Sequence, residues 1–217
     1  MISCISKEAI LQILETMAKT VEENKDYLTE LDSIIGDGDH GVNLARGFTV
    51  VLEKLPTVKN KSISCILKTV GFTLLESVGG SVGVLYGRAM IKAGETVRDK
   101  EKICLDDLVK MSEAAEEAVK SLGRAEIGDK TMLDTIHPFV ETLKKSLNEN
   151  VPLMDALEWS VEAAKMGLEN TKNMVAKKGR AKYLGEKSLG HQDVGATSCY
   201  LMIESALKML RDFDQQN

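Results

Sequence analysis

Three carboxylates lie within one short glycine-rich stretch of this sequence, Leu31-Asp32-Ser33-Ile34-Ile35-Gly36-Asp37-Gly38-Asp39-His40-Gly41. Like charges a few ångströms apart repel and raise one another's pKa, so holding three Asp together is costly unless a cation neutralises them. Oxygen ligands alone point to magnesium or calcium. The stretch runs into a segment of helical pattern, and a metal ion beside a helix N-terminus is well placed for a phosphate. The sequence therefore predicts a divalent-metal site at Asp32, Asp37 and Asp39.

Two other uses of this stretch fit its residues less well. Residues 36–41 match the G-x-G-x-x-G pattern of dinucleotide sites, but no convincing buried strand precedes them and two Asp would repel a pyrophosphate. A calcium loop starting at Asp37 needs Glu at its twelfth position, where this chain has Phe48. The plain alternative is that Asp37 or Asp39 only caps the next helix. Capping explains one Asp and leaves the others, so magnesium is favoured.

Further glycine clusters carry polar residues, at 79–87, 123–128 and 179–195. Each alone is compatible with an ordinary helix end. Residues 190–197 resemble a P-loop frame, but Ala196 replaces its lysine and no strand precedes it. Arg180, in the densest basic run of the chain, is the best candidate for a guanidinium held on a phosphate, although most such runs are solvated helix ends. Antiparallel helices bring alternate loops to one end, so the clusters together predict one shared site.

Other residues in these clusters have weaker assignments. Met132 could form an apolar wall for a base, and Ser81 offers a hydroxyl beside backbone amides. His40 and His191 lie in glycine-rich loops where they could contact a nucleotide. His137, beside a proline in a predicted helix, is expected to be structural.

The elements that must position these loops are helices. Apolar residues recur at helical spacing in five segments, residues 10–21, 63–74, 105–122, 153–168 and 196–210. Pro152 stands where a helix should begin. Strict alternation, the pattern of a half-buried strand, is hard to find. We predict an all-α fold of about eight antiparallel helices in one domain spanning residues 1–217, with the site at one end.

Composition limits the classes of protein further. The chain has 217 residues, 43% of them apolar, and a net charge of −5, which argues against a general nucleic-acid or anionic-membrane surface. Charged residues near the start argue against a signal peptide, and no apolar run approaches a membrane span. Four scattered cysteines are interpreted as core thiols in a reducing compartment, without a disulfide framework. The expected location is the cytoplasm.

Four motifs in a fixed order give this chain a resemblance to a known family. They are L-D-x-x-I-G-D-G-D-H-G, G-G-x-x-G-x-L-Y-G, G-D-K-T-M-x-D and K-G-R-A-x-Y-L-G-E-x-S-x-G-H-Q-D-x-G-A-T-S. Together they resemble the ADP-binding L subunits of dihydroxyacetone kinases, over essentially the whole chain. The resemblance implies a barrel of eight antiparallel helices, with ADP or ATP and two magnesium ions bound at one end.

The resemblance also assigns roles to residues. It implies that Asp32, Asp37 and Asp39 are metal ligands and that Arg180 is a basic, catalytic position at the phosphates. The implied nucleotide contacts are His40, Gly41, Val42, Asn43, Ser81, Val82, Gly123, Met132, Arg180, Asp193 and Gly195. One departure affects this set. Where relatives commonly carry a hydroxyl, this chain has Val82, and a hydroxyl appears one residue earlier at Ser81. Either Ser81 or bare amides then contact the phosphate, or affinity and rate are altered.

The family has two forms, and they imply different partners. In one, the domain follows a substrate-binding domain in the same chain and uses exchangeable ATP. In the other, it is a separate subunit that keeps ADP as a resident cofactor. The second form is favoured, since no partner domain is attached. It implies an M-type phosphohistidine donor of the sugar phosphotransferase system and a K-type subunit that holds dihydroxyacetone, and a homodimer is compatible with it. The alternatives are an ATP-dependent kinase subunit for another small hydroxy-ketone or polyol, and a nucleotide-loaded regulatory protein.

Overall fold

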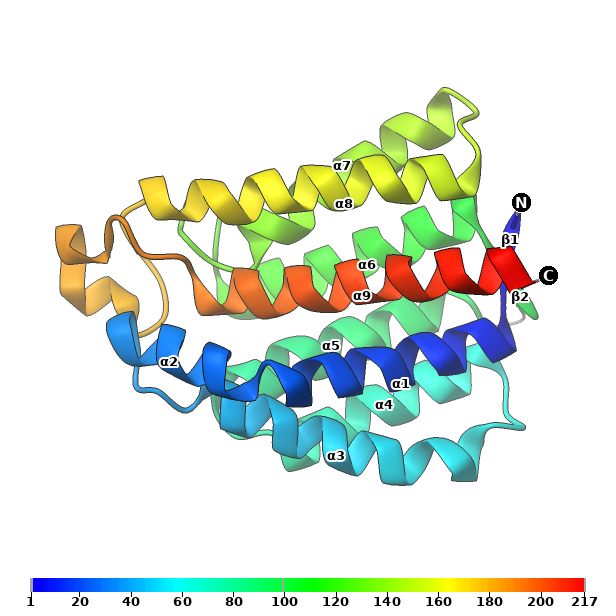
Figure 1. Ribbon diagram of the computed structural model, residues 1–217, viewed down its shortest axis with the longest axis horizontal. Coiled ribbons are helices and arrows are strands. Elements are labelled where there is room, and N and C mark those ends of the chain that lie inside the picture. Colours follow the sequence, from blue (N-terminus) through cyan, green and yellow to red (C-terminus); the bar gives the residue numbers. More distant parts are fainter. Residues whose placement is uncertain (1, 99, 217) are drawn as a thin grey trace.

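The structure, a computed structural model, describes residues 2–98 and 100–216, so residues 1, 99 and 217 of the predicted domain lie outside it. Helices dominate, as predicted (Figure 1). They are α1 (Lys7–Glu23), α2 (Lys25–Ile35), α3 (His40–Val58), α4 (Ile63–Ser77), α5 (Gly80–Thr96), α6 (Leu105–Gly123), α7 (Leu133–Asn148), α8 (Leu153–Asn170) and α9 (Val194–Gln216). Two 3₁₀ segments, η1 (Thr171–Asn173) and η2 (Ala181–Ser188), lie between α8 and α9.

The long helices close into a ring. Neighbouring pairs run from α1 to α3, then in chain order through α4, α5, α6, α7, α8 and α9, and α9 packs against α1. This ring has eight members, so the predicted all-α barrel is confirmed among the described residues. The extra helix, α2, follows α1 after the single residue Asn24 and packs against α3 and α9 at one end of the barrel (Figure 1).

Local sequence signals explain where several helices begin. The Ser6 hydroxyl accepts a hydrogen bond from the Ala9 amide (3.2 Å) and caps α1, and Ser62 caps α4 in the same way through Cys65. Pro152 immediately precedes α8, as predicted. Neighbouring helices of the ring run antiparallel, most of them through short connections and α8 to α9 through residues 171–193. The starts of α3, α5, α7 and α9 therefore lie at the same end.

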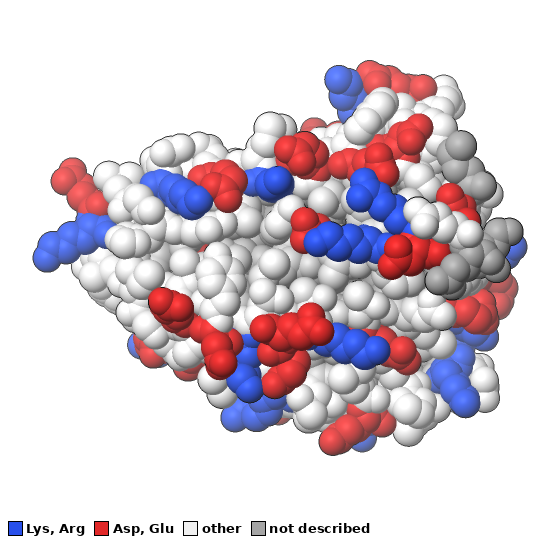
Figure 2. Space-filling view, in the orientation of Figure 1, with Lys and Arg blue, Asp and Glu red and all other residues white. Residues whose placement is uncertain are grey.

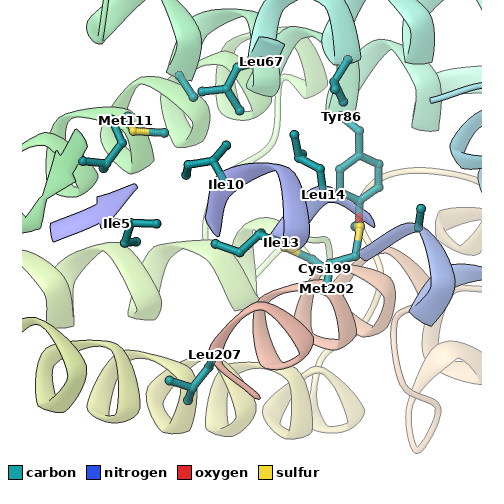
Figure 3. Close-up of a cluster of buried hydrophobic side chains, with 14 of the residues drawn as sticks. Ile5, Ile10, Ile13, Leu14, Leu67, Tyr86, Met111, Cys199, Met202 and Leu207 are labelled. Atoms are coloured by element: carbon teal, nitrogen blue, oxygen red, sulfur yellow. The ribbon is translucent and has the colours of Figure 1, made fainter. Parts of the chain in front are cut away.

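The barrel interior is apolar. One continuous cluster of buried side chains includes Leu14 on α1, Leu67 on α4, Met111 on α6 and Leu207 on α9 (Figure 3). These side chains leave an apolar cavity of about 250 Å³ between the helices. No described helix combines the length and the apolar character that crossing a bilayer requires. On the face drawn in Figure 2, acidic and basic side chains are interspersed.

The prediction for the cysteines is wrong at two of the four positions. Two short strands, β1 (Cys4–Ser6) and β2 (Lys102–Cys104), pair antiparallel with Cys4 opposite Cys104. Their Cα atoms are 4.1 Å apart, and the two side chains form a disulfide. Strands of three residues are too short to show an alternation of apolar and polar side chains, and 100 residues separate the two cysteines. The sequence alone therefore did not predict that they pair. Cys65 and Cys199 are free thiols.

Candidate functional site

The three predicted metal ligands meet where α2 ends. Asp32 lies in the last turn of α2 and is buried, while Asp37 and Asp39 lie in the connection to α3 and are exposed. One carboxylate oxygen from each lies within 4.8 Å of the others. This convergence of oxygen atoms fits a hard divalent cation such as magnesium, which takes a few carboxylates and fills its other positions with water or phosphate oxygens.

Asp32 has a second task, because it caps α3 from outside that helix. Its Oδ2 atom accepts hydrogen bonds from the amides of Asp39 (3.0 Å) and His40 (3.2 Å). Asp39 occupies the N-cap position of α3 but leaves the capping to Asp32. Burial raises the pKa of Asp32, and the two amide hydrogen bonds oppose that shift. Asp32 therefore caps α3, and neither Asp37 nor Asp39 is needed for that purpose.

The glycines of the connection make room for this arrangement. A Cβ atom on Gly36 would overlap the Asp32 carboxylate, and Gly38 has a φ of 73°, which favours glycine. The connection can therefore fold tightly around Asp32 only because these positions lack side chains.

The carboxylates line a cavity of about 360 Å³ at this end of the barrel. It is bounded by the end of α2, the starts of α3 and α5, the end of α6, and the chain before α7 and α9. Of the predicted site residues, the cavity is lined by Asp32, Asp37, Asp39, His40, Ser81, Val82, Gly123, Met132, Arg180, Asp193 and Gly195. Segments from four distant parts of the sequence thus meet in one place, as the glycine clusters predicted.

Backbone amides give the cavity a region suited to anions. Gly79 precedes α5 with an extended backbone and has no side chain with which to cap it, so the first amides of α5 remain available beside Ser81 and Val82. Both residues line the cavity, so the hydroxyl of Ser81 and the backbone amide of Val82 are both candidates to bind an anion there.

Arg180 lines the cavity from the connection between η1 and η2. Its Nε atom forms an ion pair with Oδ2 of Asp37. Its side chain is 71% exposed, so this contact contributes little to stability. The guanidinium can turn to a phosphate once a cation takes over the charge of Asp37.

A buried hydrogen-bond chain fixes His40 at the floor of the cavity. His40 Nε2 lies 2.9 Å from Ser198 Oγ, and the Tyr86 hydroxyl lies 2.8 Å from the same oxygen. Ser198 in turn donates to the carbonyl of Gly195 (3.1 Å). Burial lowers the pKa of His40 to about 4, so the ring is neutral near pH 7. His40 can therefore orient a ligand but supplies no positive charge.

The remaining wall of the cavity is apolar. Met132 is buried beside Leu85, Val119 and Ala125, and Gly123 ends α6 next to them. A flat aromatic base could lie against these side chains, which is the role predicted for Met132. Gly195 lies between Met132 and Asp193, and Asp193 caps α9 by accepting a hydrogen bond from the Ala196 amide (2.8 Å). Burial raises the pKa of Asp193 to about 7.

Three predicted nucleotide contacts lie outside this cavity. Gly41 packs against α2, where a Cβ atom would overlap the carbonyl of Lys25. The Val42 side chain is 50% exposed, and Asn43 accepts a hydrogen bond from Arg46 (3.1 Å). Gly41 and Val42 follow His40 on α3, where each residue is turned by about 100° from the one before, so both point away from the cavity. Asn43 lies one turn after His40 and beside the cavity-lining Gly79, with its Oδ1 atom 3.7 Å from the position of a Cβ atom on that glycine.

Several cavity residues were not predicted. Tyr86 and Lys130 line the cavity, and Ser198 holds His40 from behind. Lys130 and Tyr86 each lie within one of the four sequence motifs, and this position was the only indication in the sequence that they belong to the site. Their roles depend on hydrogen bonds to residues 41 to 112 positions away, which no local pattern shows.

Comparison with known proteins decides the family. A family model described as the DAK2 domain matches residues 34–208. This chain belongs to the DAK2-domain family. The ADP-binding subunit DhaL of the PEP-dependent dihydroxyacetone kinase of Escherichia coli is 43% identical over 200 residues, which cover 92% of this chain and 95% of the relative. The corresponding subunit of the PTS-dependent enzyme of Lactococcus lactis is 35% identical over 94% of this chain and 97% of the relative.

Solved structures agree on the fold. The dihydroxyacetone kinase of C. freundii, in complex with AMP-PNP and Mg²⁺, superimposes with a TM-score of 0.70 at 24% identity over 91% of this chain. The match spans about a third of that longer chain (33%). The resemblance drawn from the four motifs is thereby confirmed at the level of family and fold, and the relatives are kinase subunits.

Proposed function

We propose that this chain is the phosphoryl-transfer subunit of a dihydroxyacetone kinase and holds ADP with magnesium as a resident cofactor. The observation that carries the proposal is the meeting of Asp32, Asp37 and Asp39 at the mouth of a cavity that uncapped α5 amides also line. A relative of nearly equal length, named as an ADP-binding subunit, supports it. In this proposal, residues 1–217 form one nucleotide-binding domain.

Each part of the site has a task in the proposed reaction. The three carboxylates would hold two magnesium ions, and bound magnesium would supply charge neutralisation at the phosphate oxygens. The start of α5, with Ser81 and Val82, binds the phosphates, and Arg180 adds positive charge at the transferred group. Met132 and Gly123 contact the base, while His40, Asp193 and Gly195 orient the nucleoside. Gly41 acts through the packing of α3 against α2, and Asn43 lies beside Gly79 at the edge of the cavity, whereas the half-exposed Val42 makes no contact with the nucleotide.

The proposed transfers proceed in two steps. An M-type partner gives the phosphoryl group from its phosphohistidine to ADP: the nitrogen–phosphorus bond breaks and a new oxygen–phosphorus bond makes ATP. The bond between the β- and γ-phosphates would then break as the terminal phosphoryl group passes to a hydroxyl of dihydroxyacetone on a K-type partner; that hydroxyl loses its proton, and ADP remains as the leaving group. This subunit needs no nucleophile of its own, so alignment and charge neutralisation account for its contribution. The PEP- and PTS-dependent names of the relatives support the partner assignment.

Nucleotide exchange tests the proposal. The protein is purified without added nucleotide and denatured, and any released nucleotide is identified. Native protein is then incubated with labelled ATP. Resident ADP that exchanges slowly supports the cofactor role. Rapid exchange and turnover with ATP alone would instead assign the chain to ATP-dependent kinases, and failure to bind any adenine nucleotide would refute both.

The metal part has its own test. Asp37→Asn should abolish ADP retention without unfolding the barrel, because the exposed Asp37 caps no helix. Asp26→Asn, at the exposed start of α2, is the matched control and should retain ADP. Tight ADP binding that persists in the presence of EDTA would refute the assignment of these carboxylates as metal ligands.

Two further proposals concern the setting of the protein. A homodimer is supported by Trp159 and Met166, which lie two turns apart on α8 and are 53% and 62% exposed. Light scattering at several concentrations tests it. Cytoplasmic location is proposed together with the ADP-dependent role; the free thiols of Cys65 and Cys199 are compatible with it, whereas the Cys4–Cys104 disulfide is not the state that a reducing compartment favours. Thiol labelling in a fresh cell extract tests it, because the Cys4–Cys104 disulfide should be reduced there.

A further inference from the structure

Lys130 is the only buried lysine among the described residues, with 1% of its surface exposed. It lies between α6 and α7 with a positive φ of 61°, a conformation that costs energy for any residue with a side chain. Burying an ammonium group is expensive unless hydrogen bonds replace its water shell. Lys130 therefore combines two unfavourable features, and the proposed transfer chemistry assigns it no role.

The contacts of Lys130 are unusual. Its Nζ atom lies within hydrogen-bond distance of four backbone carbonyls, those of Thr171 (2.9 Å), Met174 (3.2 Å), Ser188 (2.6 Å) and His191 (2.5 Å). An ammonium has three N–H donors, so one of them is shared between two carbonyls. Burial lowers the pKa of Lys130, and the nearby Asp193 carboxylate opposes that shift. Four carbonyl acceptors around one nitrogen also favour the charged form over the neutral amine.

All four carbonyls belong to one connection, residues 171–191, here called the Arg180 loop. The first two carbonyls lie where the loop leaves α8, and the last two lie just before it reaches α9. The ammonium group of Lys130 thus joins the two ends of the loop by binding backbone carbonyls of both, as a coordinated metal cation would. The neighbouring Asp129 adds a backbone contact to Lys177 (3.1 Å) and an ion pair with its side chain (3.3 Å).

The middle of the Arg180 loop is tied to its ends by the Ser188 hydroxyl, which accepts a hydrogen bond from the Ala176 amide (2.9 Å) and donates one to the Gly185 carbonyl (2.6 Å). It consists of short 3₁₀ turns, and Tyr183 within it is 81% exposed. On its outer side, η2 packs against α2, and Arg180 forms an exposed, weak ion pair with Asp37. The direction of Arg180 toward the cavity therefore depends on how firmly the base of the loop is held.

We propose that Lys130 is a positioning residue, whose buried ammonium fastens the base of the Arg180 loop and so keeps Arg180 at the cavity. The link to the nucleotide rests on the proposed function, whereas the fastening does not. A neutral side chain of similar length leaves four carbonyls without a donor, and the loop opens to let water reach them. Arg180 then samples positions away from the phosphates.

Hydrogen exchange on the nucleotide-free, full-length protein tests the fastening directly. In Lys130→Met, the amides of Ala176, Leu189 and Gly190 should exchange at least tenfold faster than in the wild type, while amides of α1 and α4 keep their protection. Lys187→Met is the matched control, since Lys187 is an exposed lysine of the same loop, and it should exchange as the wild type does. Unchanged exchange in Lys130→Met would overturn the proposal.

Chemical rescue covers the case in which the methionine variant fails to fold. Lys130→Ala leaves space beside the four carbonyls, and methylammonium carries the N–H donors that they need. Methylammonium at 0.1 M should restore loop protection in this variant, whereas tetramethylammonium, which has no N–H group, should not. Equal effects of the two ions, or no rescue by methylammonium, would refute a hydrogen-bonding role for the ammonium.

A double-mutant cycle on ADP binding tests the link to Arg180. Lys130→Met should weaken ADP binding about tenfold or more in the wild type and by less than twofold in an Arg180→Ala background. Additive losses would show that Lys130 does not act through Arg180 and would overturn the positioning role. If the wild-type protein binds no ADP, the proposed function fails, but the exchange experiment still decides the fastening.

Discussion

The contact of Gly41 with α2 gives the sharpest test of how this site is built. A Cβ atom at position 41 would lie 2.5 Å from Thr29 Oγ1 and 2.8 Å from the Thr29 amide, and it would overlap the carbonyl of Lys25. Ordinary contact begins near 3.4 Å, so α2 and α3 must separate by roughly 1 Å to admit a methyl group. That displacement moves Asp39 and His40 away from Asp32, which holds their amides.

Gly41→Ala should therefore harm both stability and binding. Overpacking of this kind costs about 1–3 kcal/mol in the free energy of unfolding. A shift of about 1 Å in a positioned group weakens function by up to about 100-fold. Urea denaturation followed by circular dichroism measures the first effect, and calorimetric titration with ADP and magnesium measures the second.

Val42→Ala is the matched control for Gly41→Ala. The Val42 side chain is half exposed and faces away from the cavity, so its removal should change stability by less than about 0.5 kcal/mol and leave ADP binding unaltered. The reasoning is refuted if Gly41→Ala unfolds at the wild-type urea concentration. It is refuted equally if Val42→Ala weakens ADP binding as strongly, since residues 41–43 would then touch the nucleotide.

Three other changes have outcomes that follow from the structure. Burial raises the pKa of Asp193 to about 7 from 3.8, so between these values the folded protein holds a proton that the unfolded chain has lost. Stability of the nucleotide-free protein should fall as pH rises across that window, by up to about 4 kcal/mol, and Asp193→Asn should flatten the profile in urea titrations at pH 4 to 8. Cys104→Ser opens the link to Cys4 across 100 residues and should cost up to about 4.7 kcal/mol in the chain-entropy model; calorimetric scans with an unchanged midpoint would contradict the disulfide. Ser198→Ala leaves the buried Nε2 of His40 without its partner and should cost about 1–3 kcal/mol, measured by urea unfolding, whereas a loss below 0.5 kcal/mol would mean that water replaces the hydroxyl.

The fold was largely predictable because helical periodicity is a local signal. The stripes in residues 10–21 and 196–210 predict α1 and α9 without knowledge of their contact. The break at Asn24, which separates α2 from α1, has no glycine or proline to mark it. The β1–β2 pairing depends on two segments about 100 residues apart and was missed for that reason.

Some residues of the candidate site could likewise be predicted from local sequence, and others could not. Asp32, Asp37 and Asp39 stood out because clustered like charges demand a reason wherever they occur. That Asp32 caps α3 as well could not be read from the sequence, because a cap is normally sought next to the helix it serves. The fastening lysine, Lys130, was missed because its four carbonyl partners are backbone atoms, which carry no sequence signal.

The start of α1 and the end of α9 lie at the opposite end of the barrel from α2 and η2 (Figure 1). The 23 residues of α9 alone span about 35 Å, so a tether that starts at either terminus needs about ten extended residues to return to the cavity. A purification tag or a fluorescent protein can therefore be attached at either terminus without covering the mouth. For a genetic fusion to a substrate-holding domain the same distance is an obstacle, which a long tether or a second copy of the chain would have to overcome.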